Sequence, residues 1–211
     1  MSTLLLRLAG PMQAWGADSQ FEVRKTNREP TKSGVIGLLA AALGLKRDAP
    51  LDELTALRFG VRVDREGVLM RDFHMVKGEK SYITYRYYLC DAVFLVGVAS
   101  EDEALLKRLE EAVTHPAFPL FLGRRSCPPE GRVCLGVRPL PLEEALRQEK
   151  SLAANQSARK RMVLEAPDGM ARMRDLPVSF NSYHRQYAYR TAKEVWTDLP
   201  DNAHDPMREL R

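Results

Sequence analysis

The residues best suited to bind phosphate lie in the first quarter of the chain. Positions 30–34 read Pro-Thr-Lys-Ser-Gly and precede an apolar run, 35–43, that we expect to be a helix. The free N–H groups and the dipole at a helix N-terminus favour an anion. Lys32, Ser33 and Gly34 are therefore candidates for phosphate contacts. A simpler alternative is that Ser33 only caps the helix and Lys32 is solvated.

Basic residues in two loops could extend this contact along a nucleic-acid backbone. One group precedes the expected helix and the other follows Gly123; the members are Arg24, Lys25, Arg28, Arg124, Arg125 and Ser126. The alternative for both groups is a solvated surface loop. Gln13 is a further candidate, because it follows the Gly10-Pro11 turn. Trp15 could stack on a base, but the favoured interpretation is that it anchors the long loop to the core.

A third group of residues could carry RNA-cleavage chemistry. His74, Lys77, Lys80, Tyr82, Tyr85 and Arg86 lie within thirteen residues of one another. Cleavage without a metal needs a base for the 2′-hydroxyl, an acid for the leaving oxygen and a cation for the phosphorane. His74 has no second histidine nearby in the sequence. We therefore favour RNA binding by His74, Tyr82 and Arg86 and assign no catalytic residue.

Metal and cofactor chemistry receives little support from the sequence. The four histidines show no ligand spacing, and no carboxylate cluster suggests two-metal catalysis. Cys90, Cys127 and Cys134 have no CxxC spacing, so we expect free thiols, no zinc site and no cofactor. Cys127 is expected to be a small packed residue and not a nucleophile.

Charge and hydropathy indicate a cytoplasmic protein with a localised anion-binding face. Net charge is +4, and the basic excess is concentrated in two regions, 1–47 with seven Lys/Arg against three Asp/Glu and 150–193 with nine against three. The longest run without a charge or a strongly polar residue, Gly34 to Leu45, is too short to span a bilayer. Arg7 interrupts the N-terminal leucines, so we expect no signal peptide and no membrane partner.

The order of expected elements indicates an α+β fold. Strand 3–8 should be buried on both faces, and the helix at 35–43 is apolar all round, so it needs cover from a second unit of this chain or from another subunit. From Thr3 to Arg138 the order is strand, helix, strand, strand, helix, strand, which is ferredoxin-like or RRM-like. The expected domains are 1–148 and a small β-rich C-terminal unit, 149–211, containing a hairpin of 159–165 with 170–178.

Several segments, in order along the chain, resemble the Cas-five family of CRISPR-associated RAMP proteins, most closely its type I-E branch. They are LLLRLAGPMQAWG, RKTNREPTKSGVIGLLAAALGLKRD, RDFHMV, YLCDAVFLVGV and LFLGRRSCPP. The resemblance covers residues 4 to about 138, and it is looser in the C-terminal third.

The resemblance implies a RAMP domain that binds the 5′ handle of CRISPR RNA within the Cascade surveillance complex. It implies contacts with the backbone subunit and the large subunit, and with target DNA through the complex. It also implies a β-hairpin thumb, here about 74–88, that projects between guide RNA and target strand. In another branch, type I-C, the family member processes CRISPR RNA.

We therefore expect a non-catalytic RNA-binding subunit that caps the backbone filament at the 5′ handle in antiviral defence. The principal alternative is a metal-independent endoribonuclease for precursor CRISPR RNA. A more distant one is a general RNA-binding module with no role in assembly.

Overall fold

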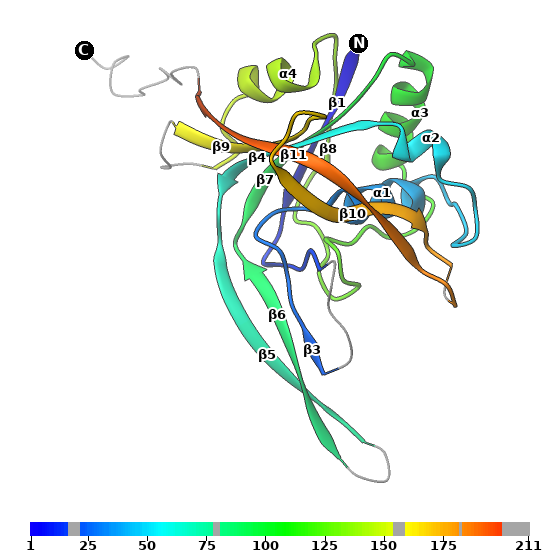
Figure 1. Cartoon of the computed structure of the whole chain (residues 1–211), viewed down its shortest axis with the longest axis vertical. Coiled ribbons are helices and arrows are strands. Elements are labelled where there is room, and N and C mark those ends of the chain that lie inside the picture. The colour runs from blue at the N-terminus through cyan, green and yellow to red at the C-terminus, as the bar shows by residue number, and fades with distance from the viewer. Residues whose placement is uncertain (17–21, 78–80, 154–158, 182, 200–211) are drawn as a thin grey trace.

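The architecture is described from a computed structural model covering residues 1–16, 22–77, 81–153, 159–181 and 183–199. The candidate Lys80 and, within the expected unit 149–211, residues 154–158, 182 and 200–211 lie outside these ranges. The described part is a mixed α/β protein built on antiparallel sheets (Figure 1).

Strand β1 (Ser2–Ala9) lies inside the main sheet and is buried on both faces, as its continuous apolar run predicts. Leu4, Leu6 and Leu8 belong to the larger core, whereas Leu5 belongs to a smaller core on the opposite face. The sheet has seven strands in the order β10-β11-β9-β4-β7-β1-β8. The other six strands are β4 (Arg58–Arg65), β7 (Val93–Ser100), β8 (Cys134–Arg138), β9 (Arg159–Glu165), β10 (Ala171–Ser179) and β11 (Gln186–Asp198).

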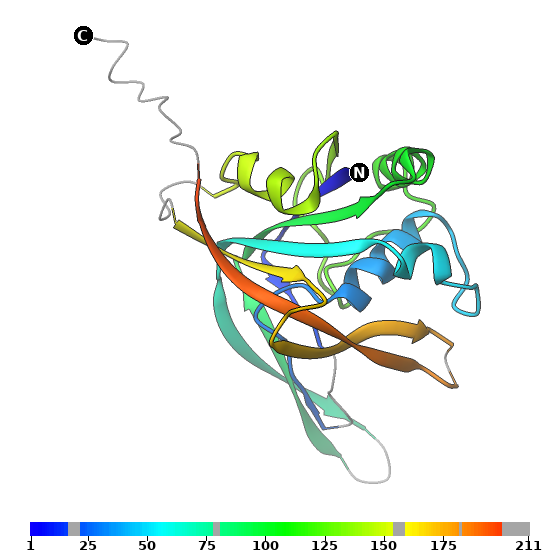
Figure 2. The ribbon, with the colours of Figure 1, turned by 45° about the horizontal axis from the view of Figure 1, so that its top comes forward.

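Helices cover the two faces of this sheet. Helix α1 (Lys32–Ala42) and helix α3 (Glu103–Thr114) contribute to the larger core, and α4 (Leu142–Gln148) contributes to the smaller one. A short helix, α2 (Asp52–Thr55), precedes β4. Figure 2 shows α1 between strand β4 and the β10–β11 end of the same sheet. The expected second cover of α1 therefore comes from this chain, and Phe180 lies beside Gly37.

A second sheet forms a long projection (Figures 1 and 2). Strand β5 (Val68–Val76) pairs antiparallel with β6 (Tyr82–Cys90) from Val68↔Cys90 to Val76↔Tyr82. Two short strands, β2 (Met12–Gln13) and β3 (Val23–Arg24), also pair with β6. The paired strands extend beyond the expected 74–88 at the base of the hairpin, while 78–80 lie outside the described residues.

The strands of the expected C-terminal unit, 149–211, continue the main sheet through the β9–β4 pairing. They correct one expectation. The expected hairpin partners β9 and β10 each pair with β11 in the described structure. The physical reason is the length of β11: its first half pairs with β10 and its second half with β9, and Ala192 lies at the junction.

None of the described helices is long and apolar enough to cross a membrane. The three cysteines are free thiols, as expected. Within the described ranges, no three histidine, cysteine or acidic side chains are arranged to hold a metal ion.

Candidate nucleic-acid interface

The N-terminus of α1 already contacts an anionic group of the protein itself, the carboxylate of Asp175. Thr31 caps the helix and accepts a hydrogen bond from the Gly34 N–H through Oγ1 at 3.2 Å. The Lys32 N–H donates to Asp175 Oδ2 at 2.8 Å. Asp175 is buried and forms an ion pair with Arg190 at 2.7 Å. The attraction of a helix terminus for an anion was predicted correctly, but the anion is a carboxylate of β10 and not a phosphate.

Lys32 itself has a structural role, which corrects the expectation of a phosphate contact. Its Nζ donates to both carboxylate oxygens of Glu165, at 3.0 and 2.9 Å, and the residue is only 2% exposed. Burial lowers the pKa of Lys32, and the hydrogen bond to Glu165 opposes that shift. The Phe59 N–H also donates to Glu165, so this ion pair joins α1 to β9 and β4.

Gly34 and Ser33 are also explained by packing. A Cβ at Gly34 would lie 2.8 Å from Trp15 Cε3, so glycine allows the indole ring to contact the helix. Ser33 is buried, and its hydroxyl lies 3.3 Å from Thr31 Oγ1. These contacts explain the helix start by packing, but they differ from the simpler alternative too, because Thr31 supplies the cap and Lys32 is paired with Glu165 instead of being solvated.

Trp15 anchors the basic loop, as favoured from the sequence. It is buried; its backbone N–H donates to Thr26 Oγ1 at 2.8 Å, and its carbonyl accepts from the Asn27 N–H at 3.0 Å. The side-chain oxygen of Gln13 accepts a hydrogen bond from the indole N–H of Trp15 at 3.0 Å.

The amide of Gln13 is therefore not an open RNA contact, which corrects that expectation. The side chain is fully buried, and Nε2 donates to the carbonyls of Leu8 and Ala92. Satisfying these backbone oxygens explains a buried glutamine near the end of β1.

The two expected basic loops meet at Arg124. Its Nη2 donates to the carbonyl oxygens of Arg24 at 2.9 Å and Lys25 at 3.4 Å. The guanidinium lies over the ring of Tyr88, 4.7 Å from its centroid. Residues one hundred positions apart in the sequence thus form one surface.

Arg86 of the hairpin joins this surface through strand pairing. Strand β3 runs parallel to β6, with Arg24 opposite Arg86, and the Tyr85 N–H donates to the Glu22 carbonyl at 2.7 Å. We call Arg24, Lys25, Arg86 and Arg124 the basic cluster. Arg24 and Lys25 are exposed, whereas Arg86 and Arg124 are half-buried.

A tight turn places Arg124 in this cluster. Gly123 has φ of +88°, and a Cβ there would lie 1.8 Å from the Ala14 carbonyl oxygen. The Cys127 N–H closes the turn on the Arg124 carbonyl at 2.9 Å. Cys127 is buried, which raises the pKa of its thiol and supports its expected packing role. Arg125 and Ser126 lie exposed on the turn, beside Arg124.

The remaining hairpin candidates lie farther along the projection. His74 Nε2 lies 2.9 Å from Asp72 Oδ2, and both side chains are partly exposed. Tyr82 lies opposite Val76, on the same face of the hairpin as His74, because the register places alternate residues on one face. Arg28 is exposed on the anchored basic loop.

The basic residues of the C-terminal strands are largely used by the fold. Arg161 forms ion pairs with three carboxylates, those of Glu29, Glu66 and Glu194. Burial alone would lower the pKa of Arg161, but Glu29 and Glu66 raise it. Lys160 is buried and donates to the Asp64 carbonyl at 3.0 Å. The basic excess of residues 150–193 therefore does not form a single open anion site.

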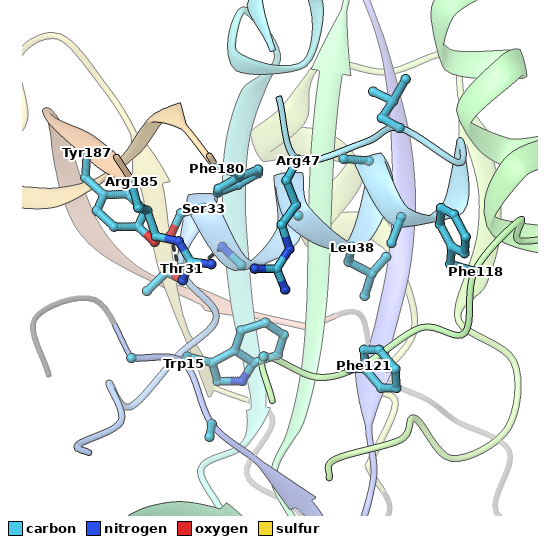
Figure 3. Close-up of a pocket in the computed structure, with 18 of the residues that line it drawn as sticks. Trp15, Thr31, Ser33, Leu38, Arg47, Phe118, Phe121, Phe180, Arg185 and Tyr187 are labelled. Carbon is cyan, nitrogen blue, oxygen red and sulfur yellow. Dashed lines mark hydrogen bonds between the residues drawn. The ribbon is translucent and has the colours of Figure 1, made fainter. Parts of the chain in front are cut away.

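Sequence reasoning missed a pocket of about 570 Å³ beside α1 (Figure 3). The pocket is lined by α1 and by three other segments, which supply its aromatic residues: Trp15, Phe118, Phe121, Phe180 and Tyr187. Gly123 also lines it, so the pocket adjoins the basic cluster. No local spacing marks these residues, because only the tertiary fold brings them together.

Comparison with known proteins gives consistent matches. The model of the family described as CRISPR-associated protein (Cas_Cas5) matches residues 3–193. The Escherichia coli (strain K12) protein "CRISPR system Cascade subunit CasD" is 42% identical over an alignment of 150 residues, and the match covers 60% of this chain and 67% of that protein.

Two solved structures match nearly the whole chain. One, described as "Crystal structure of Cas protein", has a TM-score of 0.79 and 41% identity, covering 94% of this chain and 97% of its own. The other, described as "CRISPR RNA-guided surveillance complex", has a TM-score of 0.80 and 32% identity, covering 99% of this chain and 97% of its own.

Proposed function

Because the chain belongs to the family of CRISPR-associated proteins described as Cas_Cas5, we propose that it is an RNA-binding subunit of Cascade, acting in antiviral defence in the cytoplasm. It grips the 5′ handle of CRISPR RNA and caps the backbone filament. Its partners are the backbone and large subunits, and target DNA reaches it through the complex. The observation that carries this proposal is the similarity over 99% of the chain to part of a CRISPR RNA-guided surveillance complex.

The basic cluster is the proposed contact for the RNA backbone. Arg24 and Lys25 present their side chains to solvent, while Arg124 holds their loop by its carbonyl oxygens. Arg28, Arg125 and Ser126 extend the same surface. Phosphate contacts of this kind supply affinity and position without reading the sequence.

The β5–β6 hairpin is the proposed thumb. It projects from the body of the protein (Figure 1). One face carries the candidates His74, Tyr82 and Arg86. The opposite face carries exposed apolar side chains, namely Leu69, Phe73, Met75, Ile83 and Tyr85. Such a face is suited to contact bases or a neighbouring subunit.

A ferredoxin-like core is the proposed fold assignment. Two features support it: the strand order β4-β7-β1-β8, and the positions of α1 and α3 between consecutive core strands on one face. The strands β9–β11 extend this core on the β4 side.

The function proposed here is non-catalytic. The alternative, endoribonuclease activity, is favoured by one observation: the His74–Asp72 pair, which could orient an imidazole for proton transfer. Metal-free incubation with repeat RNA separates the two functions. Intact RNA is expected, whereas site-specific cleavage that disappears in His74→Ala would favour the nuclease.

Co-expression with the other Cascade subunits tests the assembly role. The tagged chain is expected to purify with those subunits and with CRISPR RNA. A chain that binds RNA but purifies without the subunits would be a general RNA-binding module. A chain that purifies with neither would contradict the proposal.

A further inference from the structure

The pocket beside α1 has the size and lining of a ligand site. Its volume of about 570 Å³ falls within the roughly 300–1,000 Å³ typical of small-molecule pockets. Gly34, Gly37 and Ala41 of α1 line the pocket, so the helix presents small residues to it. The five aromatic residues Trp15, Phe118, Phe121, Phe180 and Tyr187 surround this part of the helix (Figure 3).

The charges around the pocket restrict the kind of ligand. Its lining includes Lys46, Arg47 and Arg185, and no aspartate or glutamate among the described residues lines it. In the view of Figure 3 the two guanidinium groups lie between Phe180 and Trp15. An apolar peptide side chain would use the aromatic rings but not the cations. A nucleotide would use both, because its base stacks on aromatic rings and its phosphate pairs with arginine.

The pocket is also continuous with the basic cluster. Trp15 lines the pocket, while its backbone groups bond to Thr26 and Asn27 in the basic loop. Gly123 lines the pocket and is followed directly by Arg124. A strand of RNA held at the cluster therefore lies next to the pocket opening.

We propose that this pocket binds one unpaired nucleotide of the RNA, with its base among the aromatic side chains and its phosphate on Arg47 and Arg185. This inference rests on the proposed RNA-binding function and assigns that function a second subsite. The cluster holds the backbone, and the pocket holds a base turned out from the strand.

Filling the pocket gives a direct test. In the full chain, Gly37→Leu places a side chain in the pocket, whereas Gly37→Ala is the matched control. A Cβ at Gly37 would make only ordinary contact with Phe180, at 3.7 Å. With labelled CRISPR RNA, we expect Gly37→Leu to weaken binding about tenfold, because base–aromatic stacking typically changes affinity about five- to 150-fold. Gly37→Ala should bind like the parent protein.

Salt dependence separates base binding from phosphate binding. Gly37→Leu should leave the slope of log affinity against log salt unchanged. The pair Arg47→Gln with Arg185→Gln should reduce its magnitude by about 0.7 for each phosphate that is no longer neutralised. Phe121→Ala serves as a second pocket variant if thermal unfolding shows that Gly37→Leu does not fold.

RNAs with one abasic nucleotide identify the occupant. At one position, removing the base should weaken parent binding as much as Gly37→Leu does, and the two effects should not add. Tight RNA binding by both pocket variants, with no such position, would overturn the inference while leaving the proposed function intact. Failed subunit assembly with unchanged RNA affinity would likewise overturn it, by indicating a protein segment in the pocket. Absence of RNA binding by the parent protein would instead contradict the proposed function, and this inference with it.

Discussion

The guanidinium group of Arg124 donates a hydrogen bond to the carbonyl oxygen of Arg24, 2.9 Å away and one hundred residues earlier in the chain. The same nitrogen reaches the carbonyl of Lys25, and the planar group rests on the ring of Tyr88. One side chain thus sets the distance between the basic loop, the turn at 123–127 and the hairpin. Its contribution to RNA binding should therefore exceed that of a single surface charge.

Replacing Arg124 should weaken RNA binding more than replacing an exposed neighbour. Hydrogen bonds to charged groups typically contribute about 1.5–3 kcal/mol, so Arg124→Ala should weaken affinity at least about tenfold. Arg124→Lys should rescue this only partly, because lysine lacks the planar fork and its stacking. Affinity titrations with CRISPR RNA check this, and Arg125→Ala is the matched control. Equal decreases in the two alanine variants would contradict the positioning role of Arg124.

Replacing Lys32 should reduce stability and leave RNA binding to the folded protein unchanged. Breaking a buried ion pair costs about 3–5 kcal/mol, and the low end applies because the Glu165 side chain is 22% exposed. Denaturant unfolding of Lys32→Met measures the decrease. The double variant Lys32→Met with Glu165→Gln should recover part of it, since no uncompensated carboxylate remains. A reduced salt slope for RNA in folded Lys32→Met would contradict the structural role.

The stability difference between the parent protein and Lys32→Met should grow as pH rises towards 10.5. Burial lowers the pKa of Lys32 from its ordinary value of 10.5. Between the lowered value and 10.5 the unfolded chain binds more protons than the folded one, so the folded form gains stability with rising pH. Chemical unfolding of both proteins at a series of alkaline pH values checks the sign. A difference that shrinks over this range would contradict it.

Gly123→Ala should disturb both the fold and the basic cluster. A left-handed backbone costs a residue with a Cβ about 1–2 kcal/mol, and here the Cβ would also collide with the Ala14 carbonyl. We expect a decrease in stability above that figure and weaker RNA binding, measured by unfolding and by titration. Gly131→Ala is the matched control, because Gly131 has φ of +66° but only an ordinary contact at 3.5 Å. The Gly131→Ala variant should be less stable than the parent protein but should bind RNA with the same affinity.

The sequence predicted those features that depend on local pattern. The apolar run of β1 and the apolar surface of α1 each require only neighbouring residues. It did not predict that Asp175 would occupy the start of α1, because that carboxylate lies 143 residues away. For the same reason, it predicted neither Glu165 as the partner of Lys32, 133 residues away, nor a pocket formed from four separate segments.

A strong local signal also failed at the C-terminal strands. Pro167-Asp168-Gly169 favours a tight turn, and the Gly169 N–H does bond to the Ala166 carbonyl. The flanking strands nevertheless pair with β11, which is long enough to pair with β10 along its first half and with β9 along its second half. The residues of the turn indicated the turn itself. The strand that pairs with both flanking strands, β11, lies beyond it in the sequence.

The contacts of α1 with Glu165 and Asp175 join segments separated by 133 and 143 residues. During synthesis the helix leaves the ribosome long before the strands that cover it. Its apolar outer surface and buried lysine lack their partners until most of the chain has emerged. Contacts of such long sequence separation slow folding and prolong exposure of aggregation-prone surface. Truncation before β10 should therefore yield a chain that aggregates, even though the core strands β1, β4, β7 and β8 are all present.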